Sequence, residues 1–465
     1  MSDPRVSPAM RSSVLVLAIV VVVFCSKAHA AATSERRPNV LFIVADDLNN
    51  DLGCYGNPDV KSPNIDALAH RGVRFDHAYC QYPQCNPSRT SFLTGLRPDT
   101  TKVFNNDVDP RRAFPNALYL PNYFKQQGWF TVSLGKVTHY GGLLQTDVSA
   151  RSVGGKKAKR AAKAASQEGT DEQTVDGQSA RYAVQLMEQH REEPFFIAVG
   201  FHRPHVPLEA PKKYFTYDAA QLTLATPPPG YPQGVPAAAL DTSRGSAGGE
   251  ATRRKTVADY YACISFVDAQ IGLLTGALDR LNLTDHTIVV LIGDHGWLHG
   301  EHGGEGKQSL FEPSARAPLI VVAPGHQADT GSPRLVEFVD IFPTLLELCG
   351  IAGGPENLEG TSFVPLLDHP LQEWKKAAFT VTARSDSGRA KKNRDPKTDV
   401  LARSVRTERY VYNDWGDGKS FELYDHQTDP AEYVNLASDP QHAAIVQEMS
   451  ALLHGGWQAA RPPAH

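Results

Sequence analysis

Short runs of consecutive hydrophobic residues alternate along the chain with longer stretches in which hydrophobic positions recur every three or four residues. Successive apolar residues suit strands that are buried on both faces, as in a parallel sheet. The runs span residues 39–44, 131–134, 195–199, 288–292 and 319–322. Helical patterns lie at residues 64–70, 118–126, 177–190, 257–281 and 340–348. This alternation predicts an α/β fold with a mostly parallel central sheet flanked by helices.

Polar side chains that can do chemistry follow four of these five runs. In open α/β sheets, active sites collect beyond the carboxyl ends of the strands. We therefore expect the polar residues to meet at one edge of the sheet. An acidic residue after a strand often only caps the next helix, which is the alternative for any single run. The residues are Asp46 and Asp47, Lys136 and His139, His202 and His205, and Asp294 and His295.

The pattern of hydrophobic and polar residues changes after about residue 370. Residues 403–413 and 421–424 alternate like strands of an antiparallel sheet, and a last helix is expected near residues 441–453. We therefore predict a catalytic domain over residues 31–370. A small C-terminal α+β subdomain would follow over residues 371–465.

Two segments, residues 141–175 and 222–253, break the pattern and are expected to be loops. The first holds six Lys and Arg residues between positions 151 and 163. A solvated surface insertion is the simple interpretation. A basic rim that attracts a sulfated polymer is the alternative.

The N-terminus has the pattern of an export signal. Arg5 and Arg11 precede an apolar run at residues 14–24, and Ala-His-Ala follows at 28–30. We expect a signal peptide over residues 1–30 that is cleaved after Ala30, so the protein would be secreted or periplasmic. An uncleaved anchor is the alternative, but the run is short for a stable membrane span.

Composition excludes little else. The net charge of −4 over 465 residues gives no nucleic-acid footprint. The chain has six cysteines, and Cys25 would leave with the signal peptide. The others are widely and irregularly spaced, so they predict no disulfide framework, although one or two bridges would be compatible with export.

The most informative run is Cys-Asn-Pro-Ser-Arg-Thr-Ser-Phe-Leu-Thr-Gly at residues 85–95. Pro87 suits the first turn of a helix, where its missing N–H costs nothing. Cys85 is therefore predicted at a helix N-terminus, where free backbone N–H groups and the helix dipole favour an anion. A buried structural cysteine and a disulfide at Cys85 are the alternatives.

This run resembles the signature of the sulfatase family, in which the cysteine is oxidised to formylglycine, an aldehyde that hydrates to a geminal diol. The resemblance spans about residues 37–455 and implies an alkaline-phosphatase-like fold and a sulfuric ester hydrolase. It also implies maturation by a formylglycine-generating enzyme, which reads a sequence that includes Arg89. From its helix, Arg89 would also reach back and steady the alkoxide of the diol.

The residues after the first and fourth runs predict a metal site. Oxygen ligands from Asp46, Asp47 and Asp294 favour a hard cation such as calcium or magnesium, and His295 leaves zinc or manganese open. The resemblance implies one calcium ion, which would also hold the oxygen of the converted Cys85. Many sulfatases have Asn at the position of His295, whereas the iduronate-2-sulfatase branch has His.

Further segments resemble the family's sulfate pocket. Lys136 and His139 lie in a Gly-Lys-x-x-His pattern, and His205 lies in a segment like the family's Lys-Pro-His-x-Pro. Arg203 stands there where Lys is common, which keeps the charge but changes its geometry. Lys307 follows Gly-Asp-His-Gly-Trp-Leu-His-Gly-Glu-His-Gly at residues 293–303, with the spacing of the iduronate-2-sulfatase branch. No distinct role is predicted for three other histidines: His202, His299 and His302.

The resemblance implies covalent catalysis in two steps. One diol hydroxyl, activated by the metal and by a base such as Asp294, attacks sulfur, and His205 or Lys307 protonates the departing sugar oxygen. His139 then helps to deprotonate the second hydroxyl, so that sulfate leaves and the aldehyde returns. The expected catalytic residues are Cys85, Arg89, His139, His205 and Asp294; the expected substrate-binding residues are Lys136, His139, His205 and Lys307.

Two other functions stay open. A phosphonate monoester or phosphodiester hydrolase shares the formylglycine and the single metal. A non-catalytic protein that binds sulfated glycans would keep Cys85 as a thiol. An alkaline phosphatase proper is disfavoured, because the sequence offers no second metal cluster and no serine nucleophile. The expected substrate is a sulfated carbohydrate; the sugar and the sulfate position are left open, because substrate loops vary within a fold.

Overall fold

The computed structural model describes residues 36–144, 146, 169–240, 249–384 and 400–463. The expected signal peptide and the basic residues between positions 151 and 163 lie outside this part, so both interpretations stay predictions.

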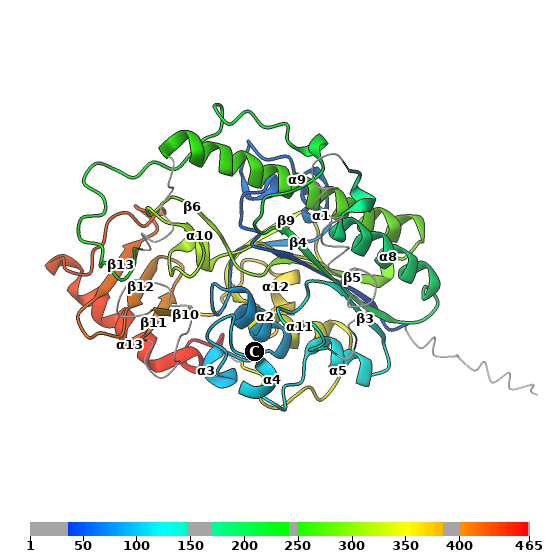
Figure 1. Cartoon of the computed structure of the whole chain (residues 1–465). Coiled ribbons are helices and arrows are strands. Elements are labelled where there is room, and N and C mark those ends of the chain that lie inside the picture. Colours follow the sequence, from blue (N-terminus) through cyan, green and yellow to red (C-terminus); the bar gives the residue numbers. More distant parts are fainter. Residues whose placement is uncertain (1–35, 145, 147–168, 241–248, 385–399, 464–465) are drawn as a thin grey trace, which may run out of the picture. The chain divides into compact units, whose positions relative to one another are not determined.

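A sheet forms the centre of the fold (Figure 1). It has seven strands, in the order β3-β4-β1-β5-β8-β2-β9. Four of the predicted runs form its parallel half, in which β1 lies between β4 and β5, and β3 pairs with β4. Every residue of β1 is buried, as expected for a strand that is covered on both faces. The bounds are β1 (Asn39–Asp46), β3 (Phe130–Gly135), β4 (Phe195–Pro204) and β5 (Thr287–Gly293).

The other half of the sheet differs from the prediction. The run at 319–322 is strand β8 (Leu319–Val322), but it is antiparallel to both β5 and β2. Strands β2 (Val73–Tyr79) and β9 (Thr330–Glu337) are missing from the prediction, because polar residues interrupt them. In β2, for example, Arg74 Nε donates to Asp76 Oδ1 at 2.7 Å, so these polar groups are paired within the sheet.

Alternate residues of β1 enter two separate cores. Leu41 and Ile43 pack in a cluster with α1 (Pro63–Ala69), α8 (Val175–Gln189) and α9 (Gly249–Arg280). Phe42 and Val44 pack in another cluster on the opposite face, because successive strand side chains point to opposite sides. The helices there are α2 (Cys85–Thr94), α5 (Leu120–Gln126) and α11 (Ile341–Leu348), so the sheet lies between two helical layers (Figure 1).

Helix α9 begins at Gly249, so the predicted loop over residues 222–253 is wrong at its C-terminal end. The helix is long and apolar enough to cross a membrane by length and composition. However, 67% of its most apolar 18-residue stretch is buried inside the protein, and the helix contacts α8, β4 and α1. It is thus a core helix in the layer that also contains α1 and α8.

A four-stranded antiparallel sheet forms the C-terminal region, in the order β10-β11-β12-β13. Its strands are β10 (Ala378–Arg384), β11 (Val400–Arg406), β12 (Tyr410–Asp414) and β13 (Phe421–Asp425). The last helix, α13 (Ala443–Ala459), packs on this sheet through Met449 and Leu453. The predicted mostly parallel central sheet flanked by helices, followed by a small C-terminal α+β subdomain, is thereby confirmed; the residue limits of the two parts stay a prediction.

Short elements connect these layers. The short helices and strands are α3 (Pro98–Thr101), α4 (Pro110–Ala113), α10 (Glu312–Ala315), α12 (Val364–Asp368), β6 (Leu298–His299) and β7 (Glu305–Gly306). The 3-10 turns are η1 (Gly53–Tyr55), η2 (Asp171–Gln173), η3 (Lys212–Tyr214), η5 (Thr284–His286), η6 (Phe338–Asp340) and η7 (Pro440–His442).

The described part of the chain has five cysteines, and all are free thiols: Cys54, Cys80, Cys85, Cys263 and Cys349.

A buried carboxyl group in the C-terminal sheet makes stability depend on pH. Glu422 accepts hydrogen bonds from Tyr424 Oη and Trp415 Nε1, both at 2.6 Å. Burial raises its pKa from 4.5 to about 7. An unfolded chain would ionise this group above about pH 4.5, whereas the native protein keeps it protonated up to about pH 7. Its contribution to stability is therefore present at low pH and is lost between pH 4.5 and 7.

We expect Glu422→Gln to stabilise the protein at pH 8 by up to about 3 kcal/mol, because the amide carries no charge to desolvate. At pH 4.5 the variant and the wild type should have nearly equal free energies of unfolding. Urea denaturation at both pH values tests this, with the exposed Glu448→Gln as the matched control. Equal effects of Glu422→Gln at the two pH values would contradict the assignment.

Candidate active site

The carboxyl ends of β1 and β5 bring two carboxylates together. These strands are parallel neighbours with Ala45 opposite Gly293, so Asp46 and Asp294 leave the sheet at the same edge. Asp47 has a left-handed backbone with φ of 63°, which aspartate tolerates better than most residues. This turn lets the consecutive side chains of Asp46 and Asp47 both face the site, although they would point apart in a strand. The N–H of Asp47 donates to Asp294 Oδ1 at 2.9 Å.

Two hydroxyl groups that the sequence did not single out hold these strand ends. Tyr260 Oη, from α9, donates to the carbonyl of Asp47 at 2.6 Å and accepts from the N–H of Asn49 at 3.0 Å. Ser88, from α2, donates to the carbonyl of Asp294. Ser88 lies in the motif around Cys85, which could have drawn attention to it. Tyr260 gives no such signal, because it belongs to the hydrophobic face of a core helix.

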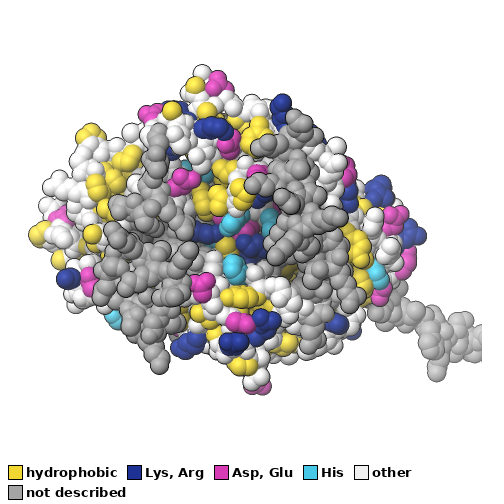
Figure 2. All heavy atoms as spheres, viewed as in Figure 1, with side chains coloured by type: hydrophobic (Ala, Val, Ile, Leu, Met, Phe, Trp, Pro, Cys, Tyr) yellow, Lys and Arg dark blue, Asp and Glu magenta, His cyan; other side chains and the backbone are white. Residues whose placement is uncertain are grey.

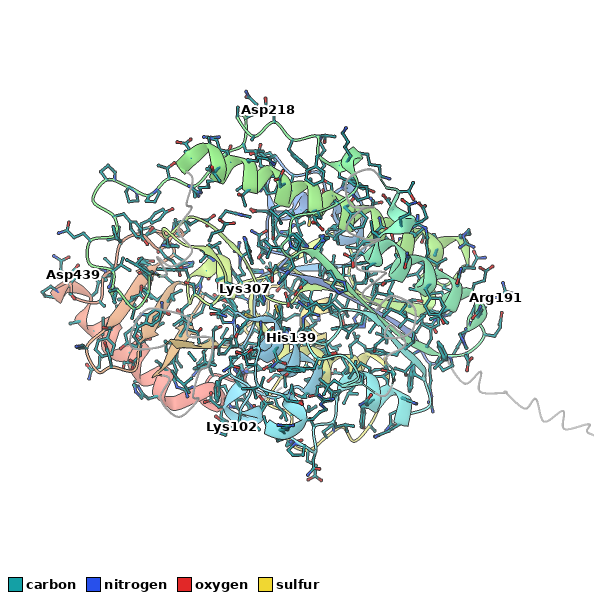
Figure 3. The ribbon with its side chains drawn as sticks, in the orientation of Figure 1. Lys102, His139, Arg191, Asp218, Lys307 and Asp439 are labelled. Carbon is teal, nitrogen blue, oxygen red and sulfur yellow. The ribbon has the colours of Figure 1, made fainter. Side chains whose placement is uncertain are left out.

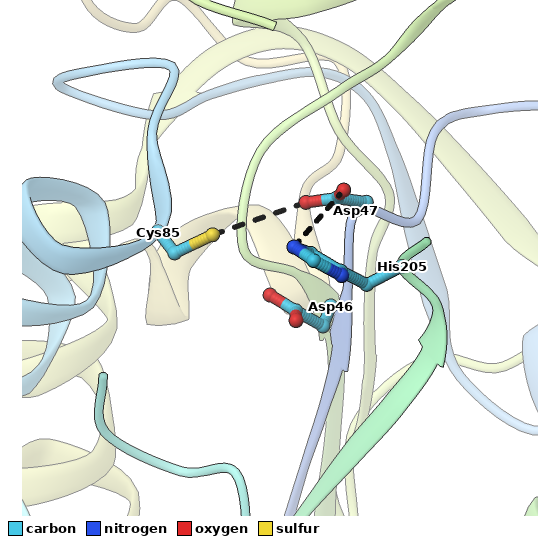
Figure 4. Close-up of side chains that lie close together, drawn as sticks. All are labelled: Asp46, Asp47, Cys85 and His205. Carbon is cyan, nitrogen blue, oxygen red and sulfur yellow. Dashed lines mark hydrogen bonds and ion pairs between the residues drawn. The ribbon is translucent and has the colours of Figure 1, made fainter. Parts of the chain in front are cut away.

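Helix α2 begins at Cys85, as predicted, and all ten of its residues are buried. Cys85 Sγ lies 3.9 Å from Asp47 Oδ1 (Figure 4). It also lies 3.0 Å from Lys307 Nζ. Burial raises the pKa of the Cys85 thiol despite the nearby Lys307. Because a neutral thiol is a poor nucleophile, the unmodified side chain is unsuited to attack.

Arg89 lies one helical turn after Cys85 and is buried between the two strand ends. Its Nε donates to Asp294 Oδ2 at 2.9 Å, and its Nη2 donates to Asp46 Oδ1 at 3.0 Å. Its Nη1 donates to the carbonyls of Lys136 and Val137. The sequence predicts that Arg89 reaches back towards the nucleophile; in the structure its guanidinium neutralises two carboxylates and fixes their orientation.

The geometry of His295 fits a bound cation. Its Nδ1 lies 2.9 Å from the carbonyl of Gly296 and donates to it, which leaves the Nε2 lone pair facing the carboxylates. This Nε2 lies 3.4 Å from Asp47 Oδ1 and 3.6 Å from Asp294 Oδ1. Neither His295 Nε2 nor Asp47 Oδ2 has a hydrogen-bond partner among the described residues, and both are buried.

Acceptor atoms that face one another repel unless a cation lies between them. The ligand atoms of Asp47, Cys85, Asp294 and His295 lie within 4.8 Å of one another, and those of Asp46, Asp47, Cys85 and His205 form a second such group. Three carboxylates and an imidazole suit calcium, magnesium, manganese or zinc. The residues predicted to hold a metal therefore lie in two overlapping groups, and the unpaired atoms His295 Nε2 and Asp47 Oδ2 fit an ion.

His205 reaches the same cluster from the end of β4. Its Nε2 lies 3.9 Å from Asp47 Oδ2 (Figure 4), and its Nδ1 lies 2.5 Å from the carbonyl of Val206. A donor hydrogen on Nδ1 is thus held by the backbone, and Nε2 faces Asp46, Asp47 and Cys85.

The two predicted lysines also meet here. Lys136 contacts the carboxylate of Asp46, and Lys307 contacts that of Asp47. Although burial works against its charge, Asp47 and its neighbours raise the pKa of Lys307. Asp46 likewise raises the pKa of Lys136 against the effect of burial, so both ammonium groups stay charged. Figure 2 shows basic and histidine side chains gathered in a central hollow of this face.

His139 brings a neutral imidazole. Burial, together with the nearby Lys136 and Arg89, lowers the pKa of His139 to about 4. Its Nδ1 is buried and has no hydrogen-bond partner in the described part of the chain. Figure 3 labels His139 and Lys307 near the centre of the same view.

Arg203 and the three unassigned histidines make other contacts. Arg203 Nη1 donates to the carbonyl of His205 at 2.8 Å, and its Nε donates to that of Glu209 at 2.5 Å, so Arg203 braces the His205 segment. The histidine nitrogens lie near the following groups: His202 near Asp176 at 3.0 Å, His299 near Asp51 at 3.2 Å, and His302 near Tyr231 at 2.7 Å.

Comparisons with known proteins identify the family of the chain. The family model described as Sulfatase matches residues 38–351, and the model described as N-sulphoglucosamine sulphohydrolase, C-terminal, matches residues 300–457. Iduronate 2-sulfatase of Homo sapiens is 31% identical over 96% of this chain and 99% of that protein. A sulfatase of Formosa agariphila is 30% identical over 90% of this chain and 86% of that protein.

Solved structures share the fold. The phosphonate monoester hydrolase of Agrobacterium radiobacter superposes with a TM-score of 0.78 at 23% identity, over 90% of this chain and 95% of that one. A 2-O GAG sulfatase superposes with a TM-score of 0.71 at 23% identity, over 92% of this chain and 95% of that one. These matches confirm the predicted alkaline-phosphatase-like fold.

Proposed function

Because this chain belongs to the sulfatase family and is a sulfuric ester hydrolase, we propose that it removes sulfate from a sulfated carbohydrate with a formylglycine made from Cys85. We further propose one calcium ion at Asp46, Asp47, Asp294 and His295, and an iduronate-2-sulfatase-like activity. The similarity to iduronate 2-sulfatase over nearly the whole chain supports this branch of the family.

One observation carries the proposal. Cys85 Sγ is buried at a helix N-terminus, 3.0 Å from an ammonium group and 3.9 Å from a carboxylate oxygen that also faces His295. A structural cysteine needs no such surroundings, since cores usually hold thiols among apolar side chains. Sγ marks the place from which the oxygens of the converted side chain would act.

Two groups that the chain would acquire supply the reactive chemistry. Oxidation of Cys85 would supply a hydrated aldehyde, with one hydroxyl for attack on sulfur and a second for the release of sulfate. A divalent cation would supply a Lewis acid that lowers the pKa of a hydroxyl and balances charge on sulfate.

The lysines would bind the sulfate group. Lys136 and Lys307 lie on the carboxylates beside Cys85, so their ammonium groups can contact sulfate oxygens that enter the site. Preorganised cations of this kind stabilise the charge that moves onto oxygen in the transition state. Arg89 is a positioning residue in this scheme, because its contacts are with Asp46 and Asp294.

The two histidines would move protons. His205 presents Nε2 to the cluster while Val206 holds its Nδ1, so a protonated His205 can donate to the leaving sugar oxygen. His139 is neutral near pH 7 because of its lowered pKa, so its free Nδ1 can accept a proton from the second hydroxyl.

Maturation and location complete the proposal. A formylglycine-generating enzyme would be the partner that oxidises Cys85. The basic, apolar and small-residue pattern of residues 1–30 supports export, to the periplasm or the medium.

A comparison of esters tests the function. Purified protein is assayed with an aryl sulfate, an aryl phosphonate monoester and a diaryl phosphodiester that share one leaving group. We expect the sulfate to give the highest kcat/KM, by at least about tenfold, because the site must prefer one transition state. A higher kcat/KM for either phosphorus ester would favour the phosphonate or phosphodiester hydrolase. Hydrolysis of none of the three would contradict the proposed function.

A further inference from the structure

The turn that follows β1 is a strained part of the active site. Asp47 has a left-handed backbone with φ of 63°, a conformation that costs an L-residue free energy. The turn lets Asp46 and Asp47, which would point apart in a strand, face the same cluster. A strained backbone persists only where its surroundings hold it. The groups that hold this turn therefore control two of the proposed metal ligands.

Two hydrogen bonds hold the backbone of Asp47. Its N–H donates to Asp294 Oδ1 at 2.9 Å. Its carbonyl accepts from Tyr260 Oη at 2.6 Å, and the same hydroxyl accepts from the N–H of Asn49 at 3.0 Å. One hydroxyl thus bridges a carbonyl and the N–H group two residues later. Asp294 would itself bind the ion, whereas Tyr260 holds the turn from outside the ligand set.

The ring of Tyr260 is fixed by its own surroundings. It is 1% exposed and comes from α9, 213 residues along the chain from Asp47. The rings of Trp297 and His299 lie 6.5 and 4.5 Å from its centre, one stacked and one edge-on. Burial raises the pKa of Tyr260 well above its ordinary value, so the hydroxyl keeps its proton and can donate. The packing of α9, rather than Asp47, therefore sets the position of this hydroxyl.

We propose that Tyr260 is a positioning residue for the metal site: its hydroxyl holds the Asp47 turn, so that the carboxylates of Asp46 and Asp47 are in place before a cation binds. The apparent affinity for a ligand falls with the fraction of protein in the binding-competent conformation. Without the hydroxyl, the buried carbonyl of Asp47 and the N–H of Asn49 lose a partner, and that fraction should decrease.

The inference rests on the proposed function and deepens it. It assigns part of the affinity for the ion to α9, a helix that supplies none of the proposed ligands. The role is separate from the reaction at sulfur, because Tyr260 contacts the backbone of the turn and not the reacting atoms.

The next residue of the helix provides a matched control. Tyr261 is 3% exposed, and its Oη accepts from Asn57 Nδ2 at 2.9 Å. Tyr261→Phe therefore removes the same atom and a hydrogen bond from the same part of α9, but it leaves the contacts of the Asp47 turn in place. If the hydroxyl of Tyr260 only stabilised the fold, the two variants would behave alike.

The first measurement is the calcium affinity of the wild type, Tyr260→Phe and Tyr261→Phe. Each protein is titrated with calcium in chelator-buffered solutions, and its unfolding temperature is recorded at each free calcium concentration. Magnesium, manganese and zinc are titrated in the same way, and the ion that the wild type binds most tightly is used for the comparison. We expect Tyr260→Phe to raise the Kd for this ion about tenfold, whereas Tyr261→Phe should match the wild type.

The second measurement is turnover of an aryl sulfate, at a temperature at which all three proteins are folded without added metal. With the ion limiting, Tyr260→Phe should have a lower kcat than the wild type. With the ion saturating, its kcat should return to the wild-type value, and its KM should be unchanged. A purely structural role of the hydroxyl would give no such rescue by the ion.

Two results would overturn the inference: an unchanged Kd in Tyr260→Phe, and an equal rise of Kd in Tyr261→Phe. If the wild type hydrolyses the aryl sulfate in either case, the sulfatase function stands and only the role of Tyr260 is wrong. If none of the ions raises the unfolding temperature of the wild type, the metal site fails and the inference fails with it. If the wild type hydrolyses no sulfate ester, the proposed function itself fails, together with the inference that rests on it.

Discussion

Replacement of Cys85 by alanine is expected to lower kcat for sulfate ester hydrolysis by at least about a thousandfold, because it removes the atom from which the nucleophile is made. The fold should survive. Cys85 is buried, but its side chain is small, so its loss should cost no more than about 1–2 kcal/mol. Lys307 keeps its contact with Asp47 in this variant, so no buried charge is left alone.

Cys80 provides the matched control for this experiment. It is a fully buried cysteine five residues earlier, and its pKa is also raised by burial. Cys80→Ala should retain near wild-type kcat at a similar loss of stability. Circular dichroism and thermal unfolding establish the fold of both variants. Substantial turnover by Cys85→Ala would contradict the account, as would equal losses in the two variants.

Replacement of Asp47 by asparagine is expected to weaken metal binding by at least about a hundredfold and to lower kcat steeply, because ligand charge sets the affinity for a hard cation. Asparagine keeps the side-chain shape and tolerates the left-handed backbone at this position, so the backbone turn should persist. Asp47 Oδ2 has no hydrogen-bond partner in the described structure, so the substitution breaks no internal bond of that atom.

Elemental analysis and thermal unfolding at increasing calcium concentrations measure this effect. A ligand that binds only the native state raises the unfolding temperature, so the wild type should be stabilised by calcium and Asp47→Asn should not. The same titration with magnesium, manganese and zinc identifies the preferred ion. Asp76→Asn, which removes the same charge on β2 outside the site, serves as control. Full metal occupancy in Asp47→Asn would refute the ligand set.

The location of the site at the carboxyl ends of the parallel strands could be predicted from the sequence, because two simple patterns coincide there. Buried parallel strands give continuous hydrophobic runs, and ligands follow their carboxyl ends. The pairs Asp46–Asp47 and Asp294–His295, almost 250 residues apart, were placed together on that argument, and the structure joins them.

Other features depend on contacts that a pattern does not record. Strand β8 pairs antiparallel with β2. The sequence did not predict β2 as a strand, because polar residues interrupt its hydrophobic pattern. The partners of Arg89 depend on the angle between α2 and the sheet, so its contacts with Asp46 and Asp294 were not foreseen. Tyr260 belongs to a helix read only for its hydrophobic face, and its polar contacts arise from tertiary packing.

The chemical state of position 85 tests the central claim most directly. Trypsin should release residues 75–89 as one peptide, which contains both Cys80 and Cys85. The protein is made in a host with a formylglycine-generating enzyme, alkylated after unfolding, and analysed by mass spectrometry. The account predicts one alkylated thiol, at Cys80, and the mass of formylglycine at position 85. Two alkylated cysteines in this peptide, from protein that hydrolyses sulfate esters, would contradict it.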